Sequence, residues 1–264
     1  MALGDLEKAL QLSRAGEELW TAHADPNYAS MNGMFGGWTA AVAVRAVCCE
    51  LEGPAAPSAL TVNFVGQVEP GSDARIRTRR VGGGRSVSYW QSELTVDDAP
   101  LAVASVVLTE RRDSDEHVEV TMPDAPDPTA IEATYPAPGP CGTRASVRPV
   151  HGLPPESDDA STYSTSWVHE TSGRSVDRVQ LAFLADHRAP RSFYWGGGPR
   201  PSATLSLSVY FHATDSELAA VGDGEVLSEA FGVRGAQSTS EEHLRLWSRH
   251  GALLASSVQM AWYR

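Results

Sequence analysis

The order of expected elements repeats once along this chain of 264 residues, and the repeat limits the possible folds more than any other feature. In each half a loop leads into a helix, and β-rich stretches follow. At residue level, an offset of 152 positions places residues 100–108 on residues 252–260 and the turn at 97–98 on 249–250. Duplication of one supersecondary unit is the simplest explanation, with a chance match of two strands rich in small residues as the alternative.

The first half is expected to contain two helices and an antiparallel meander. Residues 5–19 carry a ragged leucine stripe, and Trp38 to Leu51 is an apolar helix that has to be buried on most of its surface. The period then changes to two residues, which is typical of strands bounded by turns rich in glycine and aspartate. The expected strands are Leu60–Val68, Ala74–Val81, Ser86–Val96 and Leu101–Glu110.

The second half repeats this order after a connector. Residues 111–160 hold nine of the seventeen prolines and little periodicity, with one strand expected near Thr143–Val150. We therefore predict an α+β fold with repeats over residues 1–110 and 161–264. The expected second-half elements are a strand Tyr163–His169, a helix Ser175–His187 and strands Ala203–His212, Glu225–Val233, Glu242–Ser248 and Leu253–Tyr263.

Composition excludes several classes of protein. The net charge of −12 argues against duplex nucleic acid and anionic membranes as partners, because both need a basic face. No apolar run approaches the ~20 residues of a membrane helix, and the first residues do not read as a signal peptide. Cys48, Cys49 and Cys141 form no paired motif. We expect a soluble, cytoplasmic protein without membrane insertion, metal or other cofactor.

The two halves differ at one position of the matched strands. The offset aligns Val107 with Gln259, whose long amide falls on a strand face with Ala255, Ser257 and Ala261. Such an amide is costly to bury unless its donors and acceptor find partners. The alternative is an edge position that faces water.

A carboxylate stands out in the second helix. Val176, Val179, Phe183 and Asp186 follow helical spacing and share a face. Asp186 is then either a partly buried carboxylate tuned for proton transfer or a side chain that turns out to solvent at the helix end.

Short motifs in both halves resemble one known family. The first half has Gly33-Met34-Phe35-Gly36-Gly37-Trp38 before its central helix and Gly84-Arg85-Ser86 at a hairpin. The second half has Leu184-Ala185-Asp186, then Ala203-Thr204-Leu205 seven residues before Phe211-His212, then Ser257-Val258-Gln259. Outside the connector, the chain resembles the acyl-CoA thioesterase II family, the tandem double-hotdog thioesterases.

The resemblance implies a double hotdog, in which each repeat wraps an antiparallel sheet around a long central helix. It also implies hydrolysis of an acyl-CoA or related thioester, with Asp186, Thr204 and Gln259 as catalytic residues. Asp186 would accept a proton from water that Thr204 and Gln259 hold, without a metal or covalent nucleophile. The N–H groups of Gly36 and Gly37 are candidates for substrate or oxyanion binding, and close helix packing explains these glycines equally well. A homo-oligomer, dimer or higher, is expected.

The chain departs from the family pattern at three places. Trp38 stands where members often have glutamine, Ala213-Thr214 replaces a common Arg-Pro, and His187-Arg188 follows the aspartate in place of apolar residues. All three changes lie around the expected pocket.

Two other functions stay open. A duplicated hotdog could bind an acyl or other small apolar ligand without turning it over, or act as an enoyl-thioester hydratase through His23 and Asp25. Arg75, Arg77 and Arg79 share one strand face, which either meets the phosphates of coenzyme A or is simply solvated.

Overall fold

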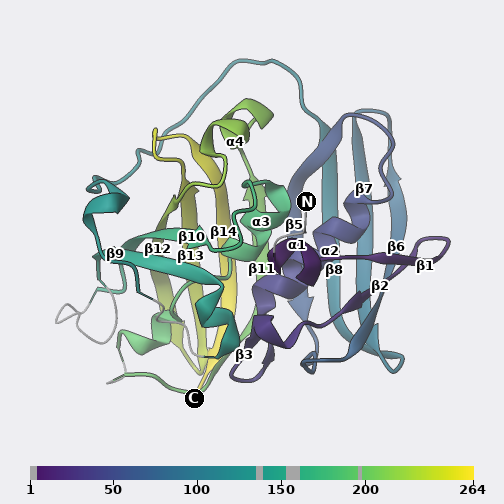
Figure 1. Ribbon diagram of the computed structural model, residues 1–264, viewed down its shortest axis with the longest axis horizontal. Coiled ribbons are helices and arrows are strands. Elements are labelled where there is room, and N and C mark those ends of the chain that lie inside the picture. The colour runs from purple at the N-terminus through teal and green to yellow at the C-terminus, as the bar shows by residue number, and fades with distance from the viewer. Residues whose placement is uncertain (1–4, 135–138, 153–160, 196–197) are drawn as a thin grey trace.

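The computed structural model describes residues 5–134, 139–152, 161–195 and 198–264 (Figure 1). Its main element is an antiparallel sheet of 12 strands in the order β1-β2-β6-β7-β8-β5-β11-β14-β13-β12-β10-β9. The first-half strands are β1 Ser13–Gly16, β2 Leu19–His23, β5 Ala55–Phe64, β6 Asp73–Gly83, β7 Val87–Val96 and β8 Ala99–Glu110. The second-half strands are β9 Ala145–His151, β10 Ser164–Glu170, β11 Ser202–Phe211, β12 Val226–Ala236, β13 Thr239–Trp247 and β14 Leu253–Tyr263.

The repeat is visible in the strand order. β5 and β11 pair in the middle of the sheet. Outward from them the order is β5-β8-β7-β6-β2-β1 in the first half and β11-β14-β13-β12-β10-β9 in the second, so corresponding strands take corresponding places. A separate small sheet pairs β3, Ala29–Ser30, with β4, Gly33–Met34. The helices are α1 Asp5–Ala9, α2 Gly36–Cys48, α3 Arg178–Leu184 and α4 Asp215–Val221. The expected α+β double hotdog is confirmed.

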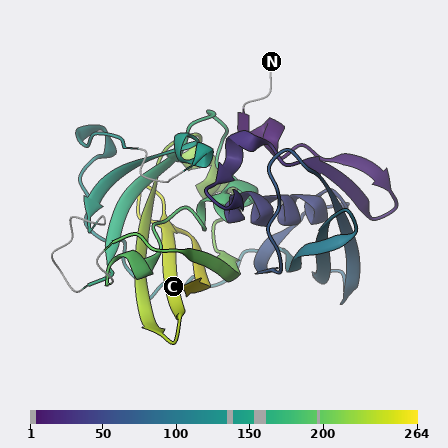
Figure 2. The same ribbon diagram turned by 90° about the horizontal axis from the view of Figure 1, so that it is seen from below.

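The two halves share one sheet and one core. β5 pairs with β11 so that Val62 faces Leu207 and Leu60 faces Val209, and all four are fully buried. The buried apolar cluster runs from one half into the other without a break. Figure 2 shows α2 lying across the inner face of the N-terminal half, where it contacts β5, β6, β7 and β8.

The second central helix is shorter than the sequence predicts. α3 begins at Arg178 because the Asp177 side chain caps it, accepting from the Gln180 N–H. Val176 lies outside the helix, and its N–H donates to the Gly222 carbonyl at 2.6 Å. The helix ends at Leu184, so the prediction of Ser175–His187 was too long at both ends. α3 packs directly against α2.

The helix expected over residues 5–19 was wrong. Only α1 is helical there, and the chain then forms the hairpin of β1 and β2. Glu18 in its turn has a φ of 49°, and Trp20 and Ala22 are buried in the two-residue period of a strand. β2 pairs with β6, and this long-range pairing overrides the local leucine pattern.

The connector is partly built into the second half. The strand expected near Thr143–Val150 is present as β9, which pairs with β10. Trp167 of β10 donates its indole N–H to the Pro126 carbonyl at 2.9 Å. Trp167, Leu227 and Trp247 form a small second core against connector residues such as Met122 and Ile131.

The residue-level alignment of the two halves is corrected by one position. The buried face of β8 carries Ala102, Ala104, Val106 and Leu108, whereas that of β14 carries Ala255, Ser257, Gln259 and Ala261. An offset of 152 therefore joins opposite faces, and Val107 is only half-buried. The hairpin between β13 and β14 is longer than the two-residue turn Asp97-Asp98, which accounts for the slip.

None of the helices in the described part of the chain has the length and apolar character that a membrane span requires.

Candidate active site

Asp186 lies in the turn that follows α3, not on the helix itself. The N–H of His187 donates to the Leu184 carbonyl and that of Arg188 to the Asp186 carbonyl, which closes the turn. Asp186 is buried, with 8% of the residue exposed. The alternative of a carboxylate that turns out to solvent is therefore wrong.

Thr204 reaches the same place because β11 has a bulge. The register with β14 pairs Thr204 with Ala261 but Ser206 with Met260, so Leu205 is an extra residue. Paired residues of antiparallel strands face the same side, and Ala261 is buried on the inner face. The bulge thus turns Thr204 inward, although it is an odd number of residues away from the inward-facing Leu207.

Gln259 occupies the middle of the sheet. β14 lies between β11 and β13, and Gln259 pairs with Leu207 on one side and Glu242 on the other. Gln259 is buried, with 7% of the residue exposed. The alternative of an edge position facing water is wrong.

Hydrogen bonds connect the three side chains. Gln259 Nε2 donates to Thr204 Oγ1 at 2.7 Å, and the Thr204 hydroxyl donates to Asp186 Oδ1 at 3.5 Å. The structure brings together two strand residues and one turn residue, at sequence distances of 55 and 18 residues. A carboxylate with an ordered hydroxyl and amide beside it can accept a proton from a bound water and orient that water.

Burial tunes the carboxylate for this task. Loss of hydration raises the pKa of Asp186 from 3.8 to about 6, although the Arg188 charge and hydrogen bonds from the Gly37 N–H and Thr204 lower it. The nearby Glu242 carboxylate raises it further. A base with a pKa of about 6 is ionised at neutral pH and still accepts a proton effectively.

The glycine pair allows α2 to approach this carboxylate. A Cβ on Gly36 would lie 2.6 Å from Asp186 Oδ2, and one on Gly37 would overlap the Phe183 carbonyl oxygen. Phe35, which precedes the helix, caps no N–H with its side chain, and Asp186 accepts from the Gly37 N–H instead. The Gly37 N–H is therefore occupied, and Gly36 is the glycine that we retain as an oxyanion candidate.

Two residues that sequence reasoning did not assign complete the site. Arg188 donates from Nη2 to Gln259 Oε1 at 2.5 Å and from Nη1 to Ser257 Oγ at 3.2 Å. Arg188 Nε lies 3.6 Å from Glu242 Oε2, and both side chains are buried. Glu242 alternates with the buried Leu244 and Leu246 on β13, and a carboxylate on an apolar strand face was a usable signal.

The other candidate residues do not join this site. His23 and Asp25 are not paired, because His23 faces Asp73 at the surface and Asp25 caps a short 3-10 helix. Trp38 donates its indole N–H to the Ala9 carbonyl of α1 at 2.8 Å.

The arginine row on β6 lies on an exposed strand face. Arg75, Arg77 and Arg79 are exposed, Arg75 pairs with Asp98 and Arg79 donates to Gln91.

His187, next to the carboxylate, is a buried neutral residue. Neither ring nitrogen has a hydrogen-bond partner among the described residues, and the ring packs against Phe35 with centroids 6.0 Å apart. Burial lowers the pKa of His187 to about 4, so the imidazole carries no charge at neutral pH.

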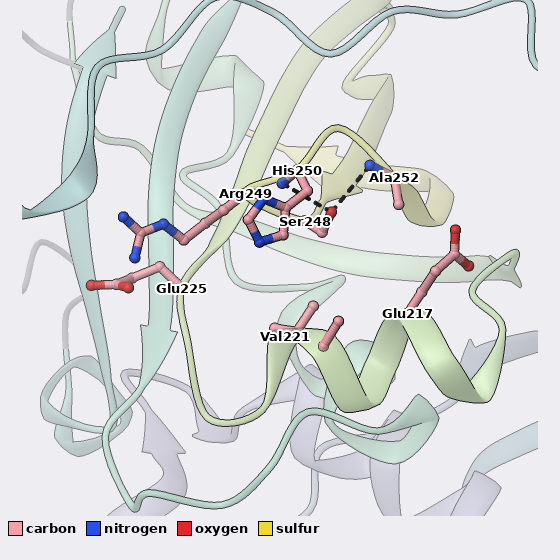
Figure 3. Close-up of a pocket in the computed structure, with 8 residues that line it drawn as sticks. Glu217, Val221, Glu225, Ser248, Arg249, His250 and Ala252 are labelled. Carbon is pink, nitrogen blue, oxygen red and sulfur yellow. Dashed lines mark hydrogen bonds between the residues drawn. The ribbon is translucent and has the colours of Figure 1, made fainter.

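A small cavity lies away from these residues. With a volume of about 110 Å³, it separates α4 from the hairpin of β13 and β14, where Ser248 accepts from the N–H groups of His250 and Ala252 (Figure 3). The described residues lining it include none of the catalytic candidates. Within the described ranges, no three His, Cys, Asp or Glu side chains gather as a metal site.

Two protein-family models together match most of the chain. The acyl-CoA thioesterase N-terminal domain matches residues 24–109, and the acyl-CoA thioesterase C-terminal domain matches residues 115–263. No curated protein matches the chain.

Solved structures share the fold over the full length. A hot dog protein described as of unknown function from Alicyclobacillus acidocaldarius is 28% identical, with a TM-score of 0.94 and coverage of 100% of this chain and 99% of that one. A candidate thioesterase II from Thermobifida fusca has 19% identity, a TM-score of 0.88 and coverage of 100% and 99%. An acyl-CoA thioesterase II from Mycobacterium marinum has 17% identity, a TM-score of 0.76 and coverage of 98% of both chains.

Proposed function

Since this chain belongs to the acyl-CoA thioesterase family and is a thioester hydrolase, we propose that it cleaves its substrate with a water molecule activated by Asp186. The observation that carries the proposal is the hydrogen-bonded set of Gln259, Thr204 and Asp186 inside the joined sheet. The proposed substrate is an acyl-CoA or a similar acyl thioester.

The proposed reaction needs one proton acceptor and no covalent intermediate. Asp186 removes a proton from the water molecule as the water oxygen attacks the thioester carbonyl carbon. The carbon–sulfur bond then breaks, and the departing thiolate receives the proton from Asp186. The products are a free carboxylic acid and a thiol, and the carboxylate is restored. In this scheme neither a metal ion nor a covalent nucleophile takes part.

The developing oxyanion requires donors beside the carboxylate. We assign this role to the Gly36 N–H at the positive end of α2, next to the Gly37 N–H that serves Asp186. The second N–H of the Gln259 amide, which Thr204 does not use, is available to hold the water.

Release of free thiol from acyl-CoA esters of graded chain length tests the proposal. We expect turnover by the wild-type chain, and a loss of about 10²-fold or more in kcat for Asp186→Asn. Asp73→Asn, a surface carboxylate that pairs with His23, is the matched control and keeps the wild-type rate. Equal rates for wild type and Asp186→Asn would refute the role of the carboxylate.

The other readings predict different outcomes. A binding protein would give saturable binding of acyl-CoA without thiol release. An enoyl-thioester hydratase would remove the absorbance of an enoyl-CoA, and the separation of His23 from Asp25 disfavours it.

A further inference from the structure

The Arg188 side chain is a buried cation held at the inner end of the catalytic hydrogen bonds. Its side chain is 3% exposed, and its guanidinium donates to the Ala185 carbonyl, Ser257 Oγ and Gln259 Oε1. Glu242, which is fully buried, lies beside its Nε. The other oxygen of Glu242 accepts from the Arg191 N–H and from Ser240 Oγ, both at 3.0 Å. The guanidinium therefore has one fixed place in the core.

This arrangement decides which way the Gln259 amide points. A guanidinium has only donors, so the Gln259 atom that faces Arg188 has to be the carbonyl oxygen. The amide nitrogen then faces Thr204 and donates to its Oγ1. Because Thr204 accepts from Gln259, its own hydrogen is free to point to Asp186.

We infer that Arg188 is a positioning residue that fixes the amide of Gln259 and, through it, the direction of the hydrogen bonds that end at Asp186. The inference rests on the proposed function. Without Arg188, the amide can turn its oxygen to Thr204. The threonine hydroxyl would then donate to Gln259 instead of Asp186, and the amide N–H that holds the water would point away.

Steady-state thiol release by Arg188→Met, Arg188→Lys and a matched control tests the inference. We expect Arg188→Met to lower kcat by about 10²-fold while KM changes by less than about threefold, because alignment and not binding is lost. Arg188→Lys keeps a donor for Gln259 and recovers part of this loss. The control is Arg178→Met, which removes another buried arginine, one that donates to Ala213 and Asp215. We expect this control to keep the wild-type kcat.

A double-mutant cycle with Gln259→Met separates positioning from a general structural role. If Arg188 acts through Gln259, adding Arg188→Met to Gln259→Met lowers kcat by less than about threefold more. If Arg188→Met acts only through general structural damage, its fold-loss in kcat would instead multiply with the fold-loss caused by Gln259→Met. Should Arg188→Met fail to fold because Glu242 is left unpaired, the pair Arg188→Met with Glu242→Gln is compared with Glu242→Gln alone.

The outcomes separate this inference from the proposed function. A wild-type chain that releases no thiol refutes the proposed function. Only the role of Arg188 is refuted if the wild-type chain releases thiol but Arg188→Met keeps the wild-type kcat. The same holds if the losses in kcat from Arg188→Met and Gln259→Met multiply, or if Arg178→Met loses as much kcat as Arg188→Met.

Discussion

Asp186 Oδ2 and the Cα of Gly36 are so close that a methyl group on Gly36 would come within 2.6 Å of the carboxylate. Gly36→Ala should therefore push Asp186 out of place and lower kcat by about 10²-fold, with a smaller effect on the free energy of unfolding. Steady-state kinetics and chemical denaturation of the same preparation measure both quantities. Gly82→Ala, at a position with open space around the added methyl group, is the control and should change neither.

The pH dependence of kcat/KM should report the ionisation of Asp186. The reaction uses the carboxylate, whose pKa burial raises to about 6, so the rate falls tenfold per pH unit below pH 6 and levels off above it. The charges of Arg188 and Glu242 also act on Asp186, whereas the Cys141 thiol, whose pKa is raised to about 11 by burial and by Asp186, is neutral across this range. A profile from pH 4.5 to 8 checks this, and a rate that stays level down to pH 5 would contradict it.

The same carboxylate should reduce the stability of the fold at neutral pH. Its pKa is raised from 3.8 to about 6 on folding, so its favourable contribution is present below pH 3.8 and lost as the pH rises through 6. Asp186→Asn should therefore raise the free energy of unfolding at pH 7 by on the order of 3 kcal/mol.

The difference between Asp186→Asn and wild type should shrink toward pH 4. Denaturant unfolding of the two proteins at pH 7 and pH 4 gives the comparison. A variant that is less stable than wild type at pH 7 would show that the carboxylate contributes to stability there.

Trp38 should affect folding and not catalysis. Its side chain is fully buried, and its indole N–H donates to the Ala9 carbonyl, which connects α2 to α1. Trp38→Phe loses this hydrogen bond and some packing, at a cost of about 1–3 kcal/mol in the free energy of unfolding. Thermal unfolding measures the loss, and an equal kcat for variant and wild type confirms that this departure from the family pattern lies outside the active site.

Local signals in the sequence were enough for much of the fold. Asp97 and Asp98 both have positive φ, at 49° and 63°, as a tight two-residue hairpin turn requires, and the turn was expected there. α4 was missed, although Thr214 and Glu217 form a capping box that could have indicated it. The helix expected over residues 5–19 failed because the pairing of β2 with β6 depends on residues far along the chain.

The candidate site was likewise predictable from the sequence only in part. Asp186, Thr204 and Gln259 were identified from residue types in a family order, and their convergence is visible only in three dimensions. Because of the bulge, inward-facing and outward-facing residues of β11 do not alternate regularly as far as Thr204. The sequence pattern therefore does not show that Thr204 faces inward. The contact between Arg188 and Gln259 spans 71 residues, so no local pattern predicts it.

Each half of the molecule protects the other from aggregation. β5 and β11 are both 10 residues long and largely apolar on their inner faces. A separated half would present such a strand as an open template for intermolecular pairing. In the joined sheet the outermost strands are poor templates, because β1 has four exposed residues and β9 carries Pro149 beside Arg148. Joining the two halves through β5 and β11 thus places the hazardous edges in the middle of the sheet, where neither can recruit another chain.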